Sequence, residues 1–111
     1  MFEIQRPKIN LAGTPFEGPE PLVTFKAPDR GGVFAILSVN EADYFVIYLG
    51  ETPNLMAHGI HASHPKYSCW KNFTGVDAKI YVATFLEESS IRRNQMLKSL
   101  LAEFTPLCNT D

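Results

Sequence analysis

The stretch GGVFAILSVNEADYFVIYLGET, residues 31–52, constrains the fold of this chain most strongly. Two apolar runs, Val33 to Val39 and Tyr44 to Leu49, stand on either side of the polar tetrapeptide NEAD. Runs of this length, rich in β-branched and aromatic residues, favour strands, and the polar connection between them favours a turn. The first run is apolar on both faces, which is typical of a strand that is covered on both sides. We therefore predict an antiparallel hairpin.

Two helices and a third strand are expected after the hairpin. Thr52 and Pro53 suit the N-cap and first position of a helix, which ends near His58 because Gly59 follows. Residues 78–85 alternate β-branched side chains and predict a strand. The last helix is expected to start at residues 87–90 and to end at Phe104. Its apolar stripe comprises Leu97, Leu100, Leu101 and Phe104.

The first thirty residues are rich in proline. Proline fixes φ and cannot donate a hydrogen bond to a sheet, so we expect neither a long helix nor a central strand there. Short extended pieces, such as Phe2 to Gln5 and Leu22 to Lys26, are compatible with this composition. The chain is therefore divided into an extended N-terminal arm, residues 1–30, and a domain, residues 31–111.

Composition limits the location and the partners of the protein. No apolar run approaches the ~20 residues that cross a bilayer, and the N-terminus has no export signal, so we expect a cytoplasmic protein without a membrane segment. In that compartment Cys69 and Cys108 are expected to be free thiols rather than a disulfide. The net charge of −2 provides no global attraction to nucleic acid, so any phosphate-binding surface must be local.

Three landmarks carry a resemblance to a known family. Gly32-Val33-Phe34 opens the first strand, Tyr48-Leu49-Gly50 closes the second, and Phe104-Thr105-Pro106-Leu107-Cys108-Asn109 ends the last helix. At these spacings, residues 28–109 resemble the GIY-YIG nuclease family. The resemblance implies an α+β fold with a three-stranded antiparallel sheet flanked by helices. It also implies phosphodiester hydrolysis with one divalent metal, a helix glutamate, an arginine and the signature tyrosines.

The chain departs from that family at the positions that carry the chemistry. Tyr48 keeps the tyrosine of the second signature, whereas Phe34 replaces that of the first. His58 stands where the resemblance places the arginine, eight residues after Gly50. The glutamate position, twelve residues before Asn109, is Leu97, which cannot coordinate a metal. The resemblance thus implies a domain that has lost the nuclease reaction and needs neither magnesium nor manganese.

The segment from Thr52 to Val76, here called the 52–76 loop, contains no acidic residue. It interleaves cations, which attract phosphates, with aromatic rings, which stack on bases. The candidate nucleic-acid-binding residues are His61, His64, Lys66, Tyr67, Trp70 and Lys71. The alternative is a surface loop whose aromatic side chains close the core of the sheet.

A metal site in the same loop has weaker support. His58, His61 and His64 are spaced three residues apart, and Cys69 would add a soft ligand. Gly59 and Pro65 interrupt a regular helix, and the usual zinc spacings are not matched, so no metal site is predicted.

Three functions follow from these observations. The first is a non-catalytic domain that binds DNA, RNA or a protein partner through its cleft and the 52–76 loop. The second is an active endonuclease that uses magnesium or manganese, with Tyr48 and His58 as catalytic residues and a relocated carboxylate such as Glu51 or Glu87. The third is a purely structural or protein-interaction module.

Overall fold

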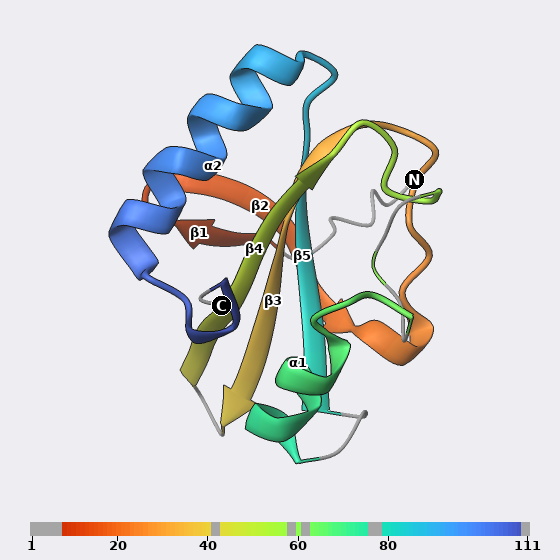
Figure 1. Ribbon diagram of the computed structural model, residues 1–111, viewed down its shortest axis with the longest axis vertical. Helices are drawn as coiled ribbons and strands as arrows, with labels where there is room; N and C mark the ends of the chain where they lie inside the picture. Colours follow the sequence, from red (N-terminus) through yellow and green to blue (C-terminus); the bar gives the residue numbers. More distant parts are fainter. Residues whose placement is uncertain (1–7, 41–42, 58–59, 61–62, 76–78, 110–111) are drawn as a thin grey trace, which may run out of the picture.

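The computed structural model describes residues 8–40, 43–57, 60, 63–75 and 79–109. These residues form a five-stranded antiparallel sheet with a helix on each face (Figure 1). The strands are β1 (Lys8–Leu11), β2 (Thr14–Pro21), β3 (Gly32–Asn40), β4 (Asp43–Thr52) and β5 (Ile80–Leu86), in the spatial order β1-β2-β5-β3-β4. The helices are α1 (Tyr67–Thr74) and α2 (Ser90–Phe104), with short 3₁₀ turns at η1 (Leu22–Thr24) and η3 (Leu107–Asn109). The α+β prediction is confirmed, and the sheet has two strands more than expected.

The predicted hairpin is β3 and β4. Its register runs from Gly32 opposite Thr52 to Asn40 opposite Asp43. One bulge interrupts the register between Ile36 and Leu37, so that β4 contains one more residue than β3 there. The third predicted strand is β5, which pairs with the other side of β3. Every residue of β3 from Gly32 to Leu37 is buried, as its doubly apolar composition predicts.

Strand alternation divides the core into two clusters, one on each face of the sheet. Phe34 and Ile36 of β3 pack with Trp70 of α1, in what we call the α1-side core. Val33, Ala35 and Leu37 pack with Leu100 of α2, in the α2-side core. The two helices therefore cover opposite faces of the sheet.

Helix α2 follows its sequence pattern closely. Ser89 caps its N-terminus, where the side-chain oxygen accepts a hydrogen bond from the Arg92 N–H at 3.3 Å. The helix ends at Phe104, and Thr105, which precedes a proline, leaves helical space at φ 43° and ψ 58°. Its predicted apolar stripe packs on the α2-side core. Among the described residues, no helix is long and apolar enough to cross a membrane.

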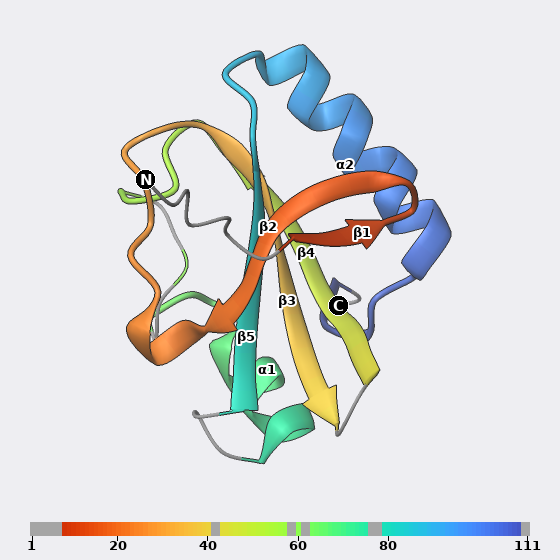
Figure 2. The same ribbon diagram turned by 180° about the vertical axis from the view of Figure 1, so that it is seen from behind.

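The prediction that residues 1–30 contain no central strand is wrong. β2 lies between β1 and β5, as the view from behind shows (Figure 2). Pairing with β5 shifts between Glu17 and Glu20, so Pro19 lies where the ladder is already broken, and Pro21 ends the strand. Phe16 is fully buried and anchors β2 in the α2-side core.

The rest of the proposed arm is only partly described. An extended piece is compatible with the sequence of residues 22–26, but residues 22–24 form η1. Residues 2–5 lie outside the described ranges. The division of the chain at residue 30 stays a prediction.

The helix predicted at Pro53 to His58 is replaced by a turn. The Thr52 hydroxyl accepts a hydrogen bond from the Asn54 N–H at 3.2 Å, as an N-cap would. The next amides, however, donate to carbonyls far along the chain: Leu55 N–H to Arg30 and Met56 N–H to Pro28. These long-range bonds, and the complete burial of Leu55, hold the segment against residues 28–30. The first helix, α1, begins later, inside the predicted loop.

Candidate nucleic-acid interface

An aromatic cluster surrounds Tyr48 on the α1 side of the sheet. The centroid of its ring lies 5.9 Å from that of Phe34, 5.2 Å from that of His64 and 5.5 Å from that of Trp70. Tyr48 stands beside the β4 bulge and is half-buried. Burial raises the pKa of its hydroxyl, because the phenolate loses hydration there. The neutral phenol is therefore the form present at physiological pH.

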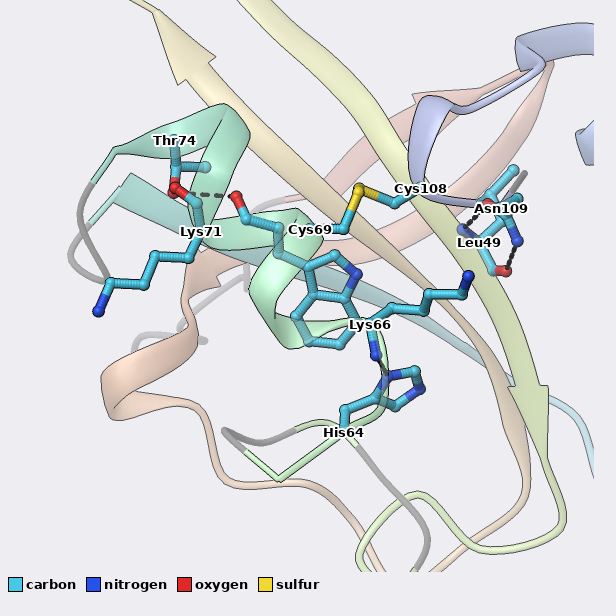
Figure 3. The surroundings of a disulfide bond; sticks show 9 residues. Leu49, His64, Lys66, Cys69, Lys71, Thr74, Cys108 and Asn109 are labelled. Atoms are coloured by element: carbon cyan, nitrogen blue, oxygen red, sulfur yellow. Dashed lines mark hydrogen bonds between the residues drawn. A yellow bond between two sulfur atoms is a disulfide. The ribbon is translucent and has the colours of Figure 1, made fainter. Parts of the chain in front are cut away.

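His64 joins the segment before α1 to this cluster. Its ring centroid lies 4.7 Å from that of Trp70 and 6.2 Å from that of Phe34. Its Nδ1 accepts a hydrogen bond from the backbone N–H of Lys66 at 3.0 Å (Figure 3). Because an accepting nitrogen carries no proton, the hydrogen of the neutral ring is on Nε2. His64 thus orients the chain as it enters α1.

The other candidate residues differ in their access to solvent. Trp70 is fully buried, so it has no exposed face for a base and serves the α1-side core instead. Among the described residues, no hydrogen-bond partner is found for its buried indole N–H. Lys66 and Tyr67 are half-buried and Lys71 is exposed. His61 and His58 lie outside the described residues. The structure therefore places His64, Lys66 and Tyr67 at the start of α1 and Lys71 in its last turn, with the Lys71 side chain pointing away from that of Lys66 (Figure 3).

The position that the resemblance assigns to a metal-binding glutamate lies on the other face. Leu97 packs against the α2-side core, whereas Tyr48 packs against the α1-side core. One turn earlier, the side-chain amide of Asn94 donates to the carbonyl of Ser90 at 2.8 Å. Phe34, buried to 3% exposure, has no hydroxyl. In the described ranges, no group of three or more His, Cys, Asp and Glu side chains could hold a metal. The residues at these positions do not fit a divalent cation.

The two carboxylates considered as relocated ligands have other partners. Glu51 Oε2 accepts a hydrogen bond from Arg93 Nε at 2.8 Å, and Glu87 Oε2 accepts from the Ser89 N–H at 3.1 Å. Arg93 is buried to 5% exposure and also donates from Nη1 to the carbonyls of Glu87 and Glu88. This guanidinium ties the end of β4 to the start of α2. Arg93 was not among the predicted site residues. It stands four residues before Leu97, and this spacing, which places both side chains on one face of α2, is the sequence signal that could have identified it.

Asn109 connects the last landmark of the chain to the second signature. The backbone N–H of Leu49 donates to its Oδ1 at 2.8 Å, and its Nδ2 donates to the Leu49 carbonyl at 2.8 Å (Figure 3). The side-chain amide therefore pairs with β4 as the peptide group of a neighbouring strand would. Residues at the end of the chain thereby hold the strand that carries Tyr48. Beyond the spacing that Asn109 shares with the family, no sequence signal indicates this role.

The prediction of two free thiols is wrong, because Cys69 and Cys108 form a disulfide (Figure 3). The bond joins α1 to η3, and the two Cα atoms lie 5.8 Å apart. Both elements pack against β4, and this tertiary arrangement is invisible in the spacing of the cysteines. Cys69 is thereby removed as a soft ligand for the histidines of the 52–76 loop.

No family model and no curated protein match the chain. Two solved structures of the GIY-YIG N-terminal endonuclease domain of UvrC from Thermotoga maritima resemble it, each with a TM-score of 0.56. They are 18% and 17% identical to it, and each comparison covers 77% of this chain and 88% of the other. Both are tyrosine-to-phenylalanine point mutants bound to the catalytic divalent cation. The fold of this chain is therefore that of the GIY-YIG endonuclease domains.

Proposed function

We propose that this chain is a GIY-YIG-like domain that binds single-stranded nucleic acid without cutting it. The observation that carries the proposal is the division of roles between the two faces of the sheet. The α1 side keeps Tyr48 in contact with the ring of His64, and α1 on that side carries Lys66, Tyr67 and Lys71. The α2 side holds Leu97, packed in its core, at the position of the family's metal ligand.

Loss of cutting is supported by the chemistry of four positions. Phosphodiester hydrolysis in this fold needs a carboxylate for the metal and a group that activates water. Leucine and phenylalanine at Leu97 and Phe34 provide neither. The pKa of the Tyr48 hydroxyl is raised by burial, which disfavours the phenolate that would act as a base. Glu51, the nearest relocated carboxylate along β4, is neutralised by the buried Arg93.

Binding is supported by the charge and the exposure around α1. Lys66 stands at the N-cap position of α1 and Lys71 in its last turn, so both ammonium groups belong to one short element. Tyr67 offers a half-buried ring at the first position of α1, and His64 lies against Tyr48. Phosphates interact with the lysines and a base stacks on the tyrosine in this arrangement. The surface is small, so affinity is expected to be modest and sensitive to salt.

The test is fluorescence anisotropy with a labelled single-stranded oligonucleotide, titrated at several salt concentrations. If each lysine contacts one phosphate, the logarithm of the association constant is expected to fall with log[salt] with a slope of about −1.4, because each phosphate contact of a single strand contributes about −0.7. Lys66→Ala with Lys71→Ala is expected to abolish that dependence and to weaken binding. The matched control is Lys79→Ala with Lys98→Ala, which removes two exposed lysines elsewhere. Equal affinity of the two double variants, or binding that ignores salt, would contradict the proposal.

A further inference from the structure

The first half of β4 is an open edge of the sheet. Among the described strands, β4 is the last in the spatial order and pairs only with β3. Toward its end, the Asn109 side chain covers the outward-facing groups of Leu49. Nearer the hairpin turn, no second strand pairs with residues 43–47 in the part of the chain that the structure describes. An open edge of this kind is a template for another extended chain.

The ladder identifies which backbone groups point outward from this edge. Leu49 stands opposite Ala35 and directs its N–H and carbonyl away from β3. In an antiparallel pair, this outward orientation recurs at every second residue of the partner strand, here Leu37 and Val39 of β3. After the bulge, these two residues stand opposite Val46 and Tyr44. The N–H and carbonyl groups of Val46 and Tyr44 therefore face outward.

A hollow lies on each side of the same edge. On the α1 side, about 370 Å³ is bounded by uncharged side chains, including Phe45, Phe73 and Leu107. On the α2 side, about 500 Å³ is bounded mainly by apolar side chains, including Ile9, Leu11 and Phe104. Successive side chains of a strand point to opposite faces. A strand added at this edge would therefore place its side chains alternately in the two hollows.

Large apolar side chains are exposed around this edge. The exposed fractions are 46% for Tyr44, 54% for Phe45, 48% for Phe73 and 60% for Leu107. They come from β4, α1 and η3, and the disulfide holds the last two elements together. Exposed apolar side chains gathered in one place, rather than scattered singly, mark interaction sites.

We propose that the β4 edge is a docking site for an extended segment of a partner protein, which adds to the sheet as a sixth strand. The outward groups of Tyr44 and Val46 require an extended backbone, and Asn109 shows how a peptide-like amide pairs with this edge. The uncharged lining of the α1-side hollow selects an apolar side chain. Main-chain bonds then supply affinity, and the two hollows supply specificity. Neither hollow is lined by a lysine of the proposed nucleic-acid interface, although both surfaces include residues of α1.

The probe is a displayed library of random linear peptides of about twelve residues, longer than an ordinary strand. The full chain serves as bait, and the enriched peptides are then synthesised and titrated. We expect apolar residues at alternate positions of the enriched peptides. Hydrogen exchange of the Tyr44 and Val46 amides is expected to slow when such a peptide binds.

Two variants and a matched control test the geometry. Tyr44→Pro removes an outward N–H and leaves the bonds to β3 intact, whereas Phe73→Asp places a charge in the wall of the α1-side hollow. Each is expected to weaken peptide binding at least about tenfold, as loss of a central contact does. Ile91→Asp, at a 70% exposed apolar position on α2, is expected to leave the affinity unchanged. Circular dichroism verifies that each variant is folded.

Three outcomes would overturn the proposal. One is a library selection without enrichment, and another is equal affinity of the enriched peptides for the wild type, Tyr44→Pro and Phe73→Asp. The third is dimerisation of the peptide-free chain in sedimentation experiments that Tyr44→Pro abolishes. That result would assign the edge to a second copy of this chain instead of a partner protein.

Discussion

Single side chains connect segments that are far apart in the sequence, and Asn109 is the clearest case. Its amide satisfies the N–H and the carbonyl of Leu49 at once. Sequence reasoning could recognise the asparagine from its place after Pro106. It could not assign its partner, because sixty residues separate the two along the chain. Arg93 is similar, since a buried guanidinium is recognisable only when Glu51 is seen beside it.

Replacing Asn109 by alanine is expected to lower the free energy of unfolding by about 1–3 kcal/mol. The substitution leaves a partly buried N–H and carbonyl of Leu49 without their partner. Urea denaturation of the wild type and the variant measures the change. The control is Asn94→Ala, which removes an exposed amide with one bond to Ser90, and we expect it to stay within about 0.5 kcal/mol. Equal effects of the two substitutions would argue against the role assigned to Asn109.

Tyr48 provides a prediction about alkaline pH. Burial raises its pKa above the ordinary value of 10.0, so the folded chain binds this proton more tightly than the unfolded chain. The resulting stabilisation is present below pH 10.0 and is lost as the pH rises through the folded pKa. When the pH is raised and tyrosinate absorbance is followed, one fraction of the absorbance change is therefore expected to occur at a higher pH than the rest in the wild type. That fraction should be missing in Tyr48→Phe, and a titration unchanged by the substitution would show that another tyrosine is responsible.

At the scale of elements, local periodicity predicted the β3–β4 hairpin, β5 and α2. Each of these elements carries its own pattern, a doubly apolar run, an alternating run or a stripe with a cap. Failures occurred where distant contacts overrode the local signal. The Thr52-Pro53 start of a helix became a turn held by residues 28–30. β2 formed despite its three prolines: Pro15 lies next to its first residue, Pro19 lies at a register shift and Pro21 ends the strand.

The disulfide between α1 and η3 is expected to stabilise the fold substantially. It closes a loop of 39 residues, for which restriction of the unfolded chain predicts up to about 4 kcal/mol. A thiol reagent should therefore detect no free thiol in the native protein. Reduction should lower the urea midpoint of the wild type. The Cys69→Ala and Cys108→Ala double variant should resemble the reduced wild type and should not respond to the reductant. Two reactive thiols in the native protein would refute the bond.

At the scale of the whole molecule, fold and chemistry were accessible from the sequence to different degrees. The signatures and their spacing predicted the architecture, which the UvrC domain structures share. The candidate interface was predicted less well, because sequence cannot show burial. Trp70 belongs to the core, although it lies within one turn of Tyr67 and Lys71 in the same helix. The assignment of Leu97 to the opposite face from Tyr48 also required the packed structure.

We propose that a nuclease fold persists here without nuclease chemistry. The most direct test of this proposal is conversion of supercoiled plasmid to nicked circles, measured with the purified chain and excess magnesium or manganese. Since no carboxylate stands at the Leu97 position and Phe34 lacks a hydroxyl, we expect the same background nicking for the wild type and Tyr48→Phe. Nicking by the wild type that requires the metal and disappears in Tyr48→Phe would contradict the proposal.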